Sequence, residues 1–159
     1  GDVYKRQGWG DVLVIVFFGF VPVGGTYYVQ ALTWTPDVTI ASLICGLLID
    51  TLLVVNNYRD READARSGKR TVIVRFGEKF GRYFYLMLGV TASLLCLCFL
   101  REGHFLAALL AQLNLIPHFL TWKRMVKIYS GKKLNSILGE TSRNMLFMGV
   151  LIAIGMLVS

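Results

Sequence analysis

Long apolar segments alternate with connections of differing length along this chain. The apolar segments lie at residues 11–31, 38–58, 81–100, 104–122 and 143–158. They approach the roughly 20 residues that a helix needs to cross the hydrocarbon core of a bilayer. The pattern therefore predicts an all-α multi-pass membrane protein with five transmembrane helices.

The connections between these segments differ in length and in charge. Residues 32–37 and 101–103 form short connections, and residues 59–80 and 123–142 form long ones. The second connection carries seven basic residues and the fourth carries five, whereas the first has none and the third has only Arg101. Because cytoplasmic loops are enriched in Lys and Arg, both long connections are predicted to be cytoplasmic, and the C-terminus to lie outside.

The composition supports the membrane class. Of the 159 residues, 55% are hydrophobic and 17% are charged, whereas soluble domains carry about 25% charged residues. The net charge of +7 comes from basic residues between apolar spans. That position favours contact with membrane lipid and excludes nucleic acid as the partner.

The cysteines and histidines show no metal or redox pattern. Cys45, Cys96 and Cys98 lie inside apolar spans without the Cys-x-x-Cys spacing, so we interpret them as structural thiols. His104 and His118 are far apart in the sequence and are interpreted as packing or helix-end residues.

A dense polar cluster, residues 56–71, directly follows the second apolar span. If the helix continues through it, Asn56, Asp60 and Asp64 are spaced i, i+4, i+8, and Asn57 lies three residues before Asp60. These oxygen-bearing side chains then share one helix face, and Glu62 points elsewhere. Mg²⁺ prefers such oxygen ligands and is commonly held by one or two carboxylates together with substrate phosphates.

Two basic residues complete this candidate site. Lys69 and Arg70 follow Gly68, which permits a turn, so both are expected to fold back onto the same phosphates. The alternative is a solvated helix end stabilised by Arg–Asp pairs. The agreement of amides, carboxylate spacing, basic tail and membrane setting favours a metal–diphosphate site.

Two further features are less clearly functional. Asp50 lies inside an apolar span, where an ionised acid costs roughly 2.5–3.5 kcal/mol, so it should face the bundle interior or stay protonated. We favour a cavity-lining or interhelical role, because Asp50 is too far from Asp60 to share a metal. Tyr27, Tyr28 and Gln30 either line the substrate cavity or belong to an interfacial aromatic belt, and both interpretations stay open.

The cluster also carries a family resemblance. Residues 56–77, with the pattern Asn-Asn-x-Arg-Asp-x-x-x-Asp-x-x-x-Gly-Lys-Arg-Thr-x-x-Val-Arg-x-Gly, resemble the second aspartate-rich motif of the UbiA superfamily of intramembrane prenyltransferases. The Gly-Lys-Arg-Thr ending is most similar to the branch that prenylates 1,4-dihydroxy-2-naphthoate in menaquinone biosynthesis. Residues 17–30 resemble the fifth transmembrane helix of that branch.

The resemblance implies a nine-helix bundle in the cell membrane, of which this chain is the C-terminal part, with its active-site loop in the cytoplasm. The first aspartate-rich motif of the superfamily is absent from the sequence. The chain is therefore expected to hold half of the metal site and to be inactive alone. Residues 1–7 look like translated adapter sequence, and residues 8–159 are taken as the prenyltransferase part.

The resemblance also implies a reaction. Mg²⁺, with Asp60, Asp64 and Asn56 as its ligands in this chain, neutralises the diphosphate of an allylic polyprenyl donor. Lys69 and Arg70 stabilise the leaving group, and Arg59 and Asn57 contribute to substrate binding. The aromatic acceptor then attacks the allylic cation, and in the naphthoate branch CO₂ is lost.

Other functions were weighed against this one. Within the superfamily, 4-hydroxybenzoate or homogentisate is an alternative acceptor. Outside it, a transporter binding a cation through the acidic cluster is less favoured, because transporters place ion sites near the bilayer midplane. A membrane scaffold without catalytic function has no feature in its favour.

Overall fold

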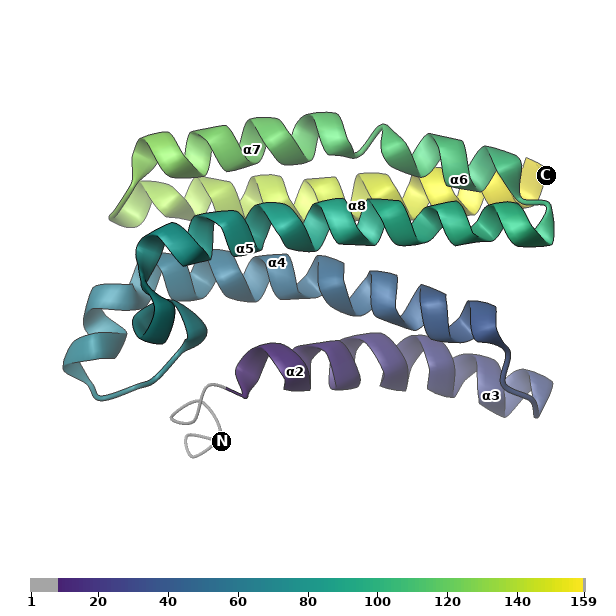
Figure 1. The fold of residues 1–159 in the computed structure, drawn as a ribbon, viewed down its shortest axis with the longest axis horizontal. Helices are drawn as coiled ribbons and strands as arrows, with labels where there is room; N and C mark the ends of the chain where they lie inside the picture. The colour runs from purple at the N-terminus through teal and green to yellow at the C-terminus, as the bar shows by residue number, and fades with distance from the viewer. Residues whose placement is uncertain (1–8, 159) are drawn as a thin grey trace.

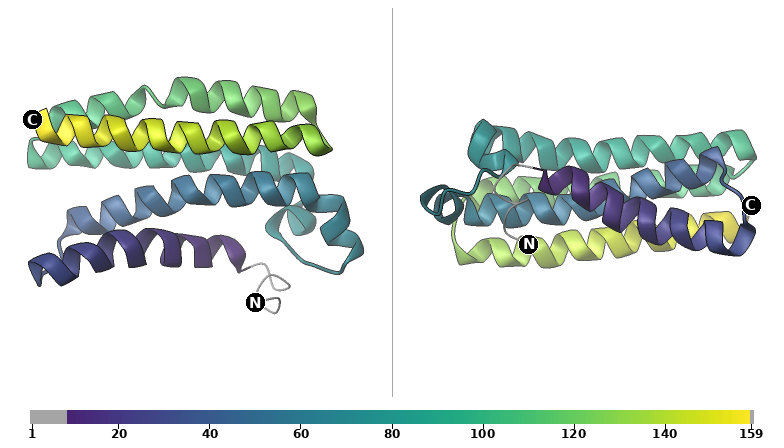
Figure 2. Two further views of the ribbon diagram at one scale, coloured as in Figure 1. Left: turned by 180° about the vertical axis from the view of Figure 1, so that it is seen from behind. Right: turned by 90° about the horizontal axis from the view of Figure 1, so that it is seen from below.

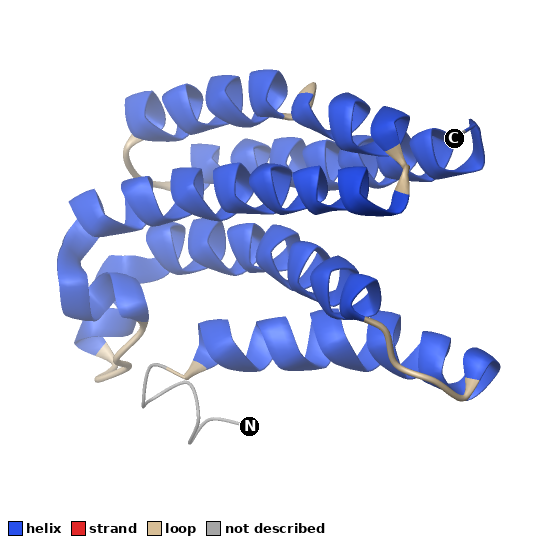
Figure 3. Ribbon diagram, turned by 45° about the vertical axis from the view of Figure 1, so that its right-hand side comes forward, coloured by secondary structure: helices blue, strands red, loops and turns tan. Residues whose placement is uncertain are grey.

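The computed structural model describes residues 9–158, and this range is helical throughout, with short connections and no strand (Figure 3). Five helical rods follow one another. All five are long and apolar enough to cross a membrane, so the predicted all-α, five-helix class is confirmed. The predicted non-native lead, residues 1–7, lies outside the described residues.

Several rods are composite. The first consists of α2 (Gly10–Val14), the π-helix η1 (Ile15–Gly25) and α3 (Thr26–Ala31), and the second is α4 (Pro36–Arg66). The third joins α5 (Val72–Cys96) to η2 (Leu97–Glu102), and the fourth joins α6 (Phe105–Gln112) to α7 (Leu115–Ile128). The fifth consists of the short η3 (Lys132–Leu134) and α8 (Asn135–Val158).

The helix ends were predicted less well than the helices themselves. Residues 59–80 and 123–142 were expected to be long connections, yet α4 continues to Arg66 and α5 begins at Val72. Similarly, α8 begins at Asn135 instead of residue 143. The prediction was wrong because charge marks where a span leaves the apolar layer, whereas a helix continues in water as long as its residues favour it.

The two basic connections lie at the same end of the bundle. In Figure 1 the turn between α4 and α5 and the turn between α7 and α8 are both at the left, near the start of α2, and the C-terminus is at the right. Antiparallel neighbours with short connections require this alternation. That the basic end faces the cytoplasm stays a prediction.

Local interactions determine where α4 begins and where the chain turns after it. Thr35 is its N-cap and accepts a hydrogen bond from the Val38 backbone N–H, with Pro36 at the first helical position, where proline loses no helical bond. At the far end Gly68 adopts a positive φ of 72°, which a residue with a side chain rarely adopts. The chain then turns over residues 67–71 and enters α5, where Thr71 is the N-cap, and a non-helical Gly77 (φ 87°, ψ 169°) kinks α5 after its first turn.

The first rod packs almost entirely against α4, and it lies at the edge of the bundle in the left-hand view of Figure 2. The contact is made through glycines. A Cβ on Gly46 would lie 2.9 Å from the Ile15 Cα, and one on Gly19 would collide with the Ser42 carbonyl oxygen. Small residues at these positions let the two backbones approach closely, as in many membrane helix pairs.

The other rods share a core on the opposite side of α4. Val54, Tyr58, Tyr85 and Met125 are buried together there. Between α5 and α8, the hydroxyl groups of Tyr85 and Thr141 form a hydrogen bond of 3.0 Å. The α4 helix is thus held on one face by this core and on the other by the first rod.

The glycine contact predicts a specific sensitivity. Gly46→Leu should lower the free energy of unfolding by about 1–3 kcal/mol, because the new side chain forces the helices apart. Thermal denaturation in detergent, followed by circular dichroism, measures the effect. Gly139→Leu in α8 is the matched control, because open space surrounds a Cβ there. Equal melting temperatures for the two variants would contradict the packing argument.

Candidate functional site

The polar residues near the end of α4 face a common cavity of about 400 Å³. Asn56, Asn57, Asp60 and Asp64 all line it. They do so because α4 continues unbroken to Arg66, which keeps residues three and four positions apart on one face. The exposed Glu62 is not among the lining residues. The structure therefore contains the predicted row of side chains on one face of α4, namely Asn56, Asn57, Asp60 and Asp64, which we call the acidic stripe.

The cavity lies between the first rod and α4, and the start of the following connection closes it. Its walls are apolar on one side, with Leu13, Val14, Phe17, Phe18 and Leu53. Its other side carries the amides and carboxylates of α4 together with Lys69 and Thr71. This division matches a ligand with a charged head and an apolar body.

Arg59 holds the polar face of α4 in order. Its guanidinium donates to both carboxylate oxygens of Asp60 at 2.7 Å, to Asn56 Oδ1 at 2.7 Å and to Asn135 Oδ1 at 2.9 Å. The two-pronged geometry is typical of strong Arg–carboxylate pairs. Arg59 therefore neutralises Asp60 and links the end of α4 to the start of α8.

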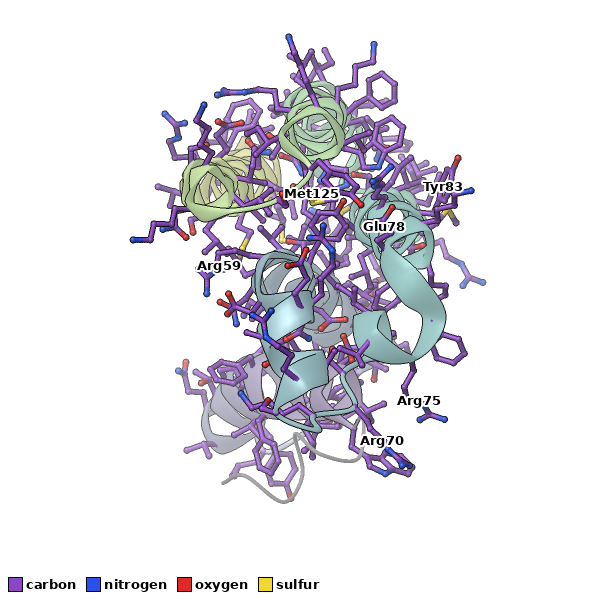
Figure 4. The ribbon with its side chains drawn as sticks, turned by 90° about the vertical axis from the view of Figure 1, so that its left-hand side faces the viewer. Arg59, Arg70, Arg75, Glu78, Tyr83 and Met125 are labelled. Atoms are coloured by element: carbon purple, nitrogen blue, oxygen red, sulfur yellow. The ribbon has the colours of Figure 1, made fainter. Side chains whose placement is uncertain are left out.

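Lys69 folds back onto α4 as predicted, whereas Arg70 does not. The Lys69 ammonium lies 3.2 Å from Asp64 Oδ1, and the Lys69 backbone N–H donates to the Asp64 carbonyl at 3.0 Å. Arg70 is exposed and points away from the helices in Figure 4, and it does not line the cavity. The turn at Gly68 thus delivers only one of the two basic residues to the site.

A cation–aromatic cluster fixes the end of α4 from the other side. The Arg61 guanidinium lies 4.5 Å from the ring centroid of Tyr58 and 5.0 Å from that of Tyr129. Arg82 of α5 donates to the Tyr58 hydroxyl at 2.9 Å and pairs with Glu78. These contacts join α4, α5 and the segment after α7, so the carboxylates are carried on an anchored helix.

Asp11 is a cavity residue that sequence reasoning missed. It lies in α2, is only 8% exposed, and lines the same cavity as the acidic stripe. Its Oδ1 has no hydrogen-bond partner. In the sequence, Asp11 is an acid at the start of an apolar span, where acids commonly stabilise a helix N-terminus. The sequence alone does not distinguish Asp11 from such a residue.

Asp50 faces the bundle interior, as expected. It is fully buried, and neither carboxylate oxygen has a hydrogen-bond partner. It does not line the cavity itself, and its position one turn after Gly46 places it opposite Asp11 across the contact between the first rod and α4. The interhelical interpretation of Asp50 therefore agrees with its position, although the residue opposite it is another acid.

The predicted aromatic residues lie elsewhere. Tyr27 and Gln30 line a second cavity, of about 610 Å³, together with His104 at the opposite end of the bundle. Tyr28 is exposed on α3. The structure therefore does not place Tyr27, Tyr28 or Gln30 beside the acidic stripe. Their role in substrate binding stays a prediction.

The acidic stripe suits a metal that completes its shell with ligands from elsewhere. The described part of the chain holds no group of three or more His, Cys, Asp or Glu side chains placed to hold a metal ion. Asp60 and Asp64 with the Asn56 amide provide hard oxygen donors from a single helix. Mg²⁺ is commonly held by so few protein ligands when water and substrate phosphates supply the rest, so these residues fit Mg²⁺ better than a closed structural site.

Comparison with known proteins gives a consistent result. A model described as the UbiA prenyltransferase family matches residues 3–150. A 1,4-dihydroxy-2-naphthoate octaprenyltransferase of Haemophilus influenzae is 33% identical over 161 residues, covering 98% of this chain and 51% of that protein. The enzyme of the same name from Escherichia coli is 42% identical over 94 residues, covering 59% of this chain and 30% of that protein.

A more distant relative extends the range. The UbiA prenyltransferase domain-containing protein 1 of Dictyostelium discoideum is 30% identical over 98% of this chain and 46% of that protein. The chain thus spans about half the length of the relatives that it matches from end to end. No solved structure matches the chain.

The Arg59 network predicts how stability responds to loss of a carboxylate. The side chains of Arg59 and Asp60 are 25% and 37% exposed, so their pair contributes little to folding. Asp60→Asn should change the free energy of unfolding by less than about 1 kcal/mol. Arg59→Ala should cost more, because it also removes the bonds to Asn56 and Asn135. Chemical denaturation of both variants measures the difference, and a larger loss in Asp60→Asn would show that the acid is structural.

Proposed function

The chain belongs to the UbiA prenyltransferase family, and on that premise we propose that the protein transfers a polyprenyl group from an allylic polyprenyl diphosphate to 1,4-dihydroxy-2-naphthoate. The product would be a demethylmenaquinol, the reduced form, released together with CO₂ and diphosphate. The relatives that carry the name of this reaction support the choice of acceptor over 4-hydroxybenzoate or homogentisate. The family also argues against a cation transporter.

One observation carries the proposal. A single cavity brings the carboxylates and amides of α4 and the Lys69 ammonium together with an apolar wall that includes Phe17, Phe18 and Leu53. A polyprenyl diphosphate has the same two parts, an anionic head and a hydrocarbon chain. In this arrangement the head lies at the basic end of the bundle, and the chain extends between the first rod and α4 toward the hydrocarbon region.

Each polar residue then has a distinct task. Mg²⁺ bound by Asp60 and Asp64, with Asn56, would neutralise the diphosphate and make it a better leaving group. Lys69 provides a positive charge beside the same oxygens and stabilises the charge that develops on them. Asn57 orients the head group through its amide. Arg59, which pairs with Asp60 in the structure, would supply a further positive charge for the diphosphate if a metal took its place on that carboxylate.

The bonds change in a simple order. The allylic C–O bond breaks, and the electron pair leaves with the diphosphate. The aromatic carbon that carries the carboxylate forms the new C–C bond to the allylic carbon, and its bond to the carboxylate breaks to release CO₂. The apolar wall keeps water away from the allylic cation, which water would otherwise trap as an alcohol.

A chimera is the direct test of this proposal. In it, this chain replaces the segment that it matches in the Haemophilus influenzae relative, which supplies the remaining half. Membranes containing the chimera should convert a polyprenyl diphosphate and 1,4-dihydroxy-2-naphthoate to the prenylated product only when Mg²⁺ is present. We expect this chain on its own to be inactive, because the family resemblance implies a metal site that also needs the first aspartate-rich motif, which this sequence does not contain.

Substitutions in the acidic stripe should abolish turnover. Asp60→Asn and Asp64→Asn should each lower kcat at least about 100-fold, because each removes a carboxylate charge that would hold the metal ion. Glu62→Gln is the matched control, since Glu62 is exposed on the same helix turn and should retain activity. Turnover by the parent chimera after removal of divalent metal would contradict the mechanism.

The structure also separates the two basic residues of the connection. Lys69→Ala should reduce kcat by about 10–1,000-fold, because Lys69 lines the cavity and developing negative charge depends on such donors. Arg70→Ala should reduce it far less, because Arg70 is exposed and outside the cavity. Steady-state kinetics of the two variants in the chimera measure the difference. Equal losses would mean that the connection rearranges when substrate binds.

A further inference from the structure

Two buried acids, Asp11 and Asp50, lie opposite each other beside the cavity. The α2 and α4 helices run antiparallel, and Ile15 contacts Gly46. Asp11 lies one turn before Ile15, and Asp50 lies one turn after Gly46, so the two side chains lie at the same level of this contact. No hydrogen bond in the structure reaches either oxygen of Asp50 or Oδ1 of Asp11.

Burying two carboxyl groups side by side destabilises the fold unless a ligand or another group interacts with them. Asp50 is fully buried and Asp11 is 92% buried, being 8% exposed. A buried acceptor without a partner costs about 1–3 kcal/mol. Unpartnered carboxyl oxygens in such surroundings favour a ligand that donates a hydrogen bond to them.

The cavity shows from which side such a donor must come. Asp11 lines the cavity, whereas Asp50 does not, so only Asp11 is open to a ligand. Leu13, Val14, Phe17 and Leu53 also line it, which leaves room for an apolar or aromatic group there. No third acid accompanies the pair in a metal-binding group within residues 9–158, so an aromatic ring bearing a hydroxyl group fits better than a cation.

The spacing from the acidic stripe suits this ligand. Asp50 precedes Asp60 by ten residues, or about 15 Å along the helix axis. That is too far to share a metal, but it spans a diphosphate followed by an aromatic ring. The donor head would lie at Asp60 and Asp64, and the acceptor would lie between them and Asp11.

We propose that Asp11, supported by Asp50, is the binding and proton-accepting site for a hydroxyl group of the aromatic acceptor. This inference rests on the proposed function and adds the acceptor's position to it. As the new C–C bond forms, the hydroxyl proton moves to the Asp11 carboxylate, and the O–H electron pair enters the ring. When CO₂ leaves, the electron pair of its C–C bond passes through the ring to the same oxygen, which takes the proton back from Asp11. The ring carbon thereby becomes more nucleophilic toward the allylic carbon, whose electron pair leaves with the diphosphate.

Ligand binding tests the proposal without turnover. The chimera should bind 1,4-dihydroxy-2-naphthoate at least about 10-fold more tightly than 2-naphthoate, which lacks both hydroxyl groups, because an acceptor that loses its donor is left unpaired. Asp11→Leu should remove this preference. Isothermal titration calorimetry measures both affinities. An unchanged preference in a folded Asp11→Leu variant would overturn the proposal.

Turnover provides a second readout with a variant that keeps the shape of the side chain. Asp11→Asn should lower kcat about 100-fold, the usual contribution of a general base, and leave the KM for polyprenyl diphosphate unchanged. Asp50→Asn should give a smaller loss, because Asp50 acts through Asp11. Asp37→Asn is the control, since this acid lies in the first turn of the same helix at the opposite end. Full activity of Asp11→Asn would overturn the proton-accepting role.

The two proposals fail in different ways. If Asp60→Asn abolishes turnover while Asp11→Asn does not, the prenyltransferase assignment stands and the role of Asp11 is wrong. If the parent chimera makes no prenylated product but prefers the dihydroxy ligand through Asp11, the hydroxyl site stands and the proposed reaction is wrong.

Discussion

The continuity of α4 is the constraint on which the rest of the structure depends. Its 31 residues extend about 46 Å at 1.5 Å per residue, well beyond the roughly 30 Å of a bilayer core. One rod therefore both crosses the apolar layer and carries the acidic stripe out of it. Any break near Tyr58 would separate the carboxylates from the apolar cavity below them.

Two kinds of contact keep this long helix in place. Toward the first rod it presents Gly46 against Ile15, and Gly19 of that rod lies against the Ser42 carbonyl, so that backbone lies against backbone. Toward the other rods it presents Tyr58, Val54 and Val55, which are buried in the core. The polar end is then tied laterally by Arg59 and Arg61. Rigid support of this sort is what a site needs if its ligands are to converge without reorganisation.

Much of this could be predicted from the sequence, because the relevant forces are local. Apolar segment length predicted five rods, and helical spacing predicted that Asn56, Asp60 and Asp64 share a face. The helix ends were wrong, because hydropathy reports the edge of the apolar layer and says nothing about where backbone hydrogen bonding stops. The different orientations of Lys69 and Arg70 depend on the φ of Gly68 and were not readable from composition.

The pairing of Asp11 with Asp50 was out of reach for a different reason. It depends on how far one helix is shifted along another, and side-chain pattern within either helix does not specify that shift. The placement of Tyr27 and Gln30 at the opposite end has the same origin, since the direction of the first rod decides which of its ends meets the acidic stripe. Contacts between rods, more than residues within them, determine which chemistry is brought together.

The glycine contact between Ile15 and Gly46 has a consequence for how such a protein changes over time. A larger residue at Gly46 would move the first rod as a unit, and the cavity between that rod and α4 would change its width. If Asp11 binds the aromatic acceptor as proposed, the residue at position 46 would set the size of the ring that fits there without touching it. Substitutions at this position would then alter substrate choice and folding stability together.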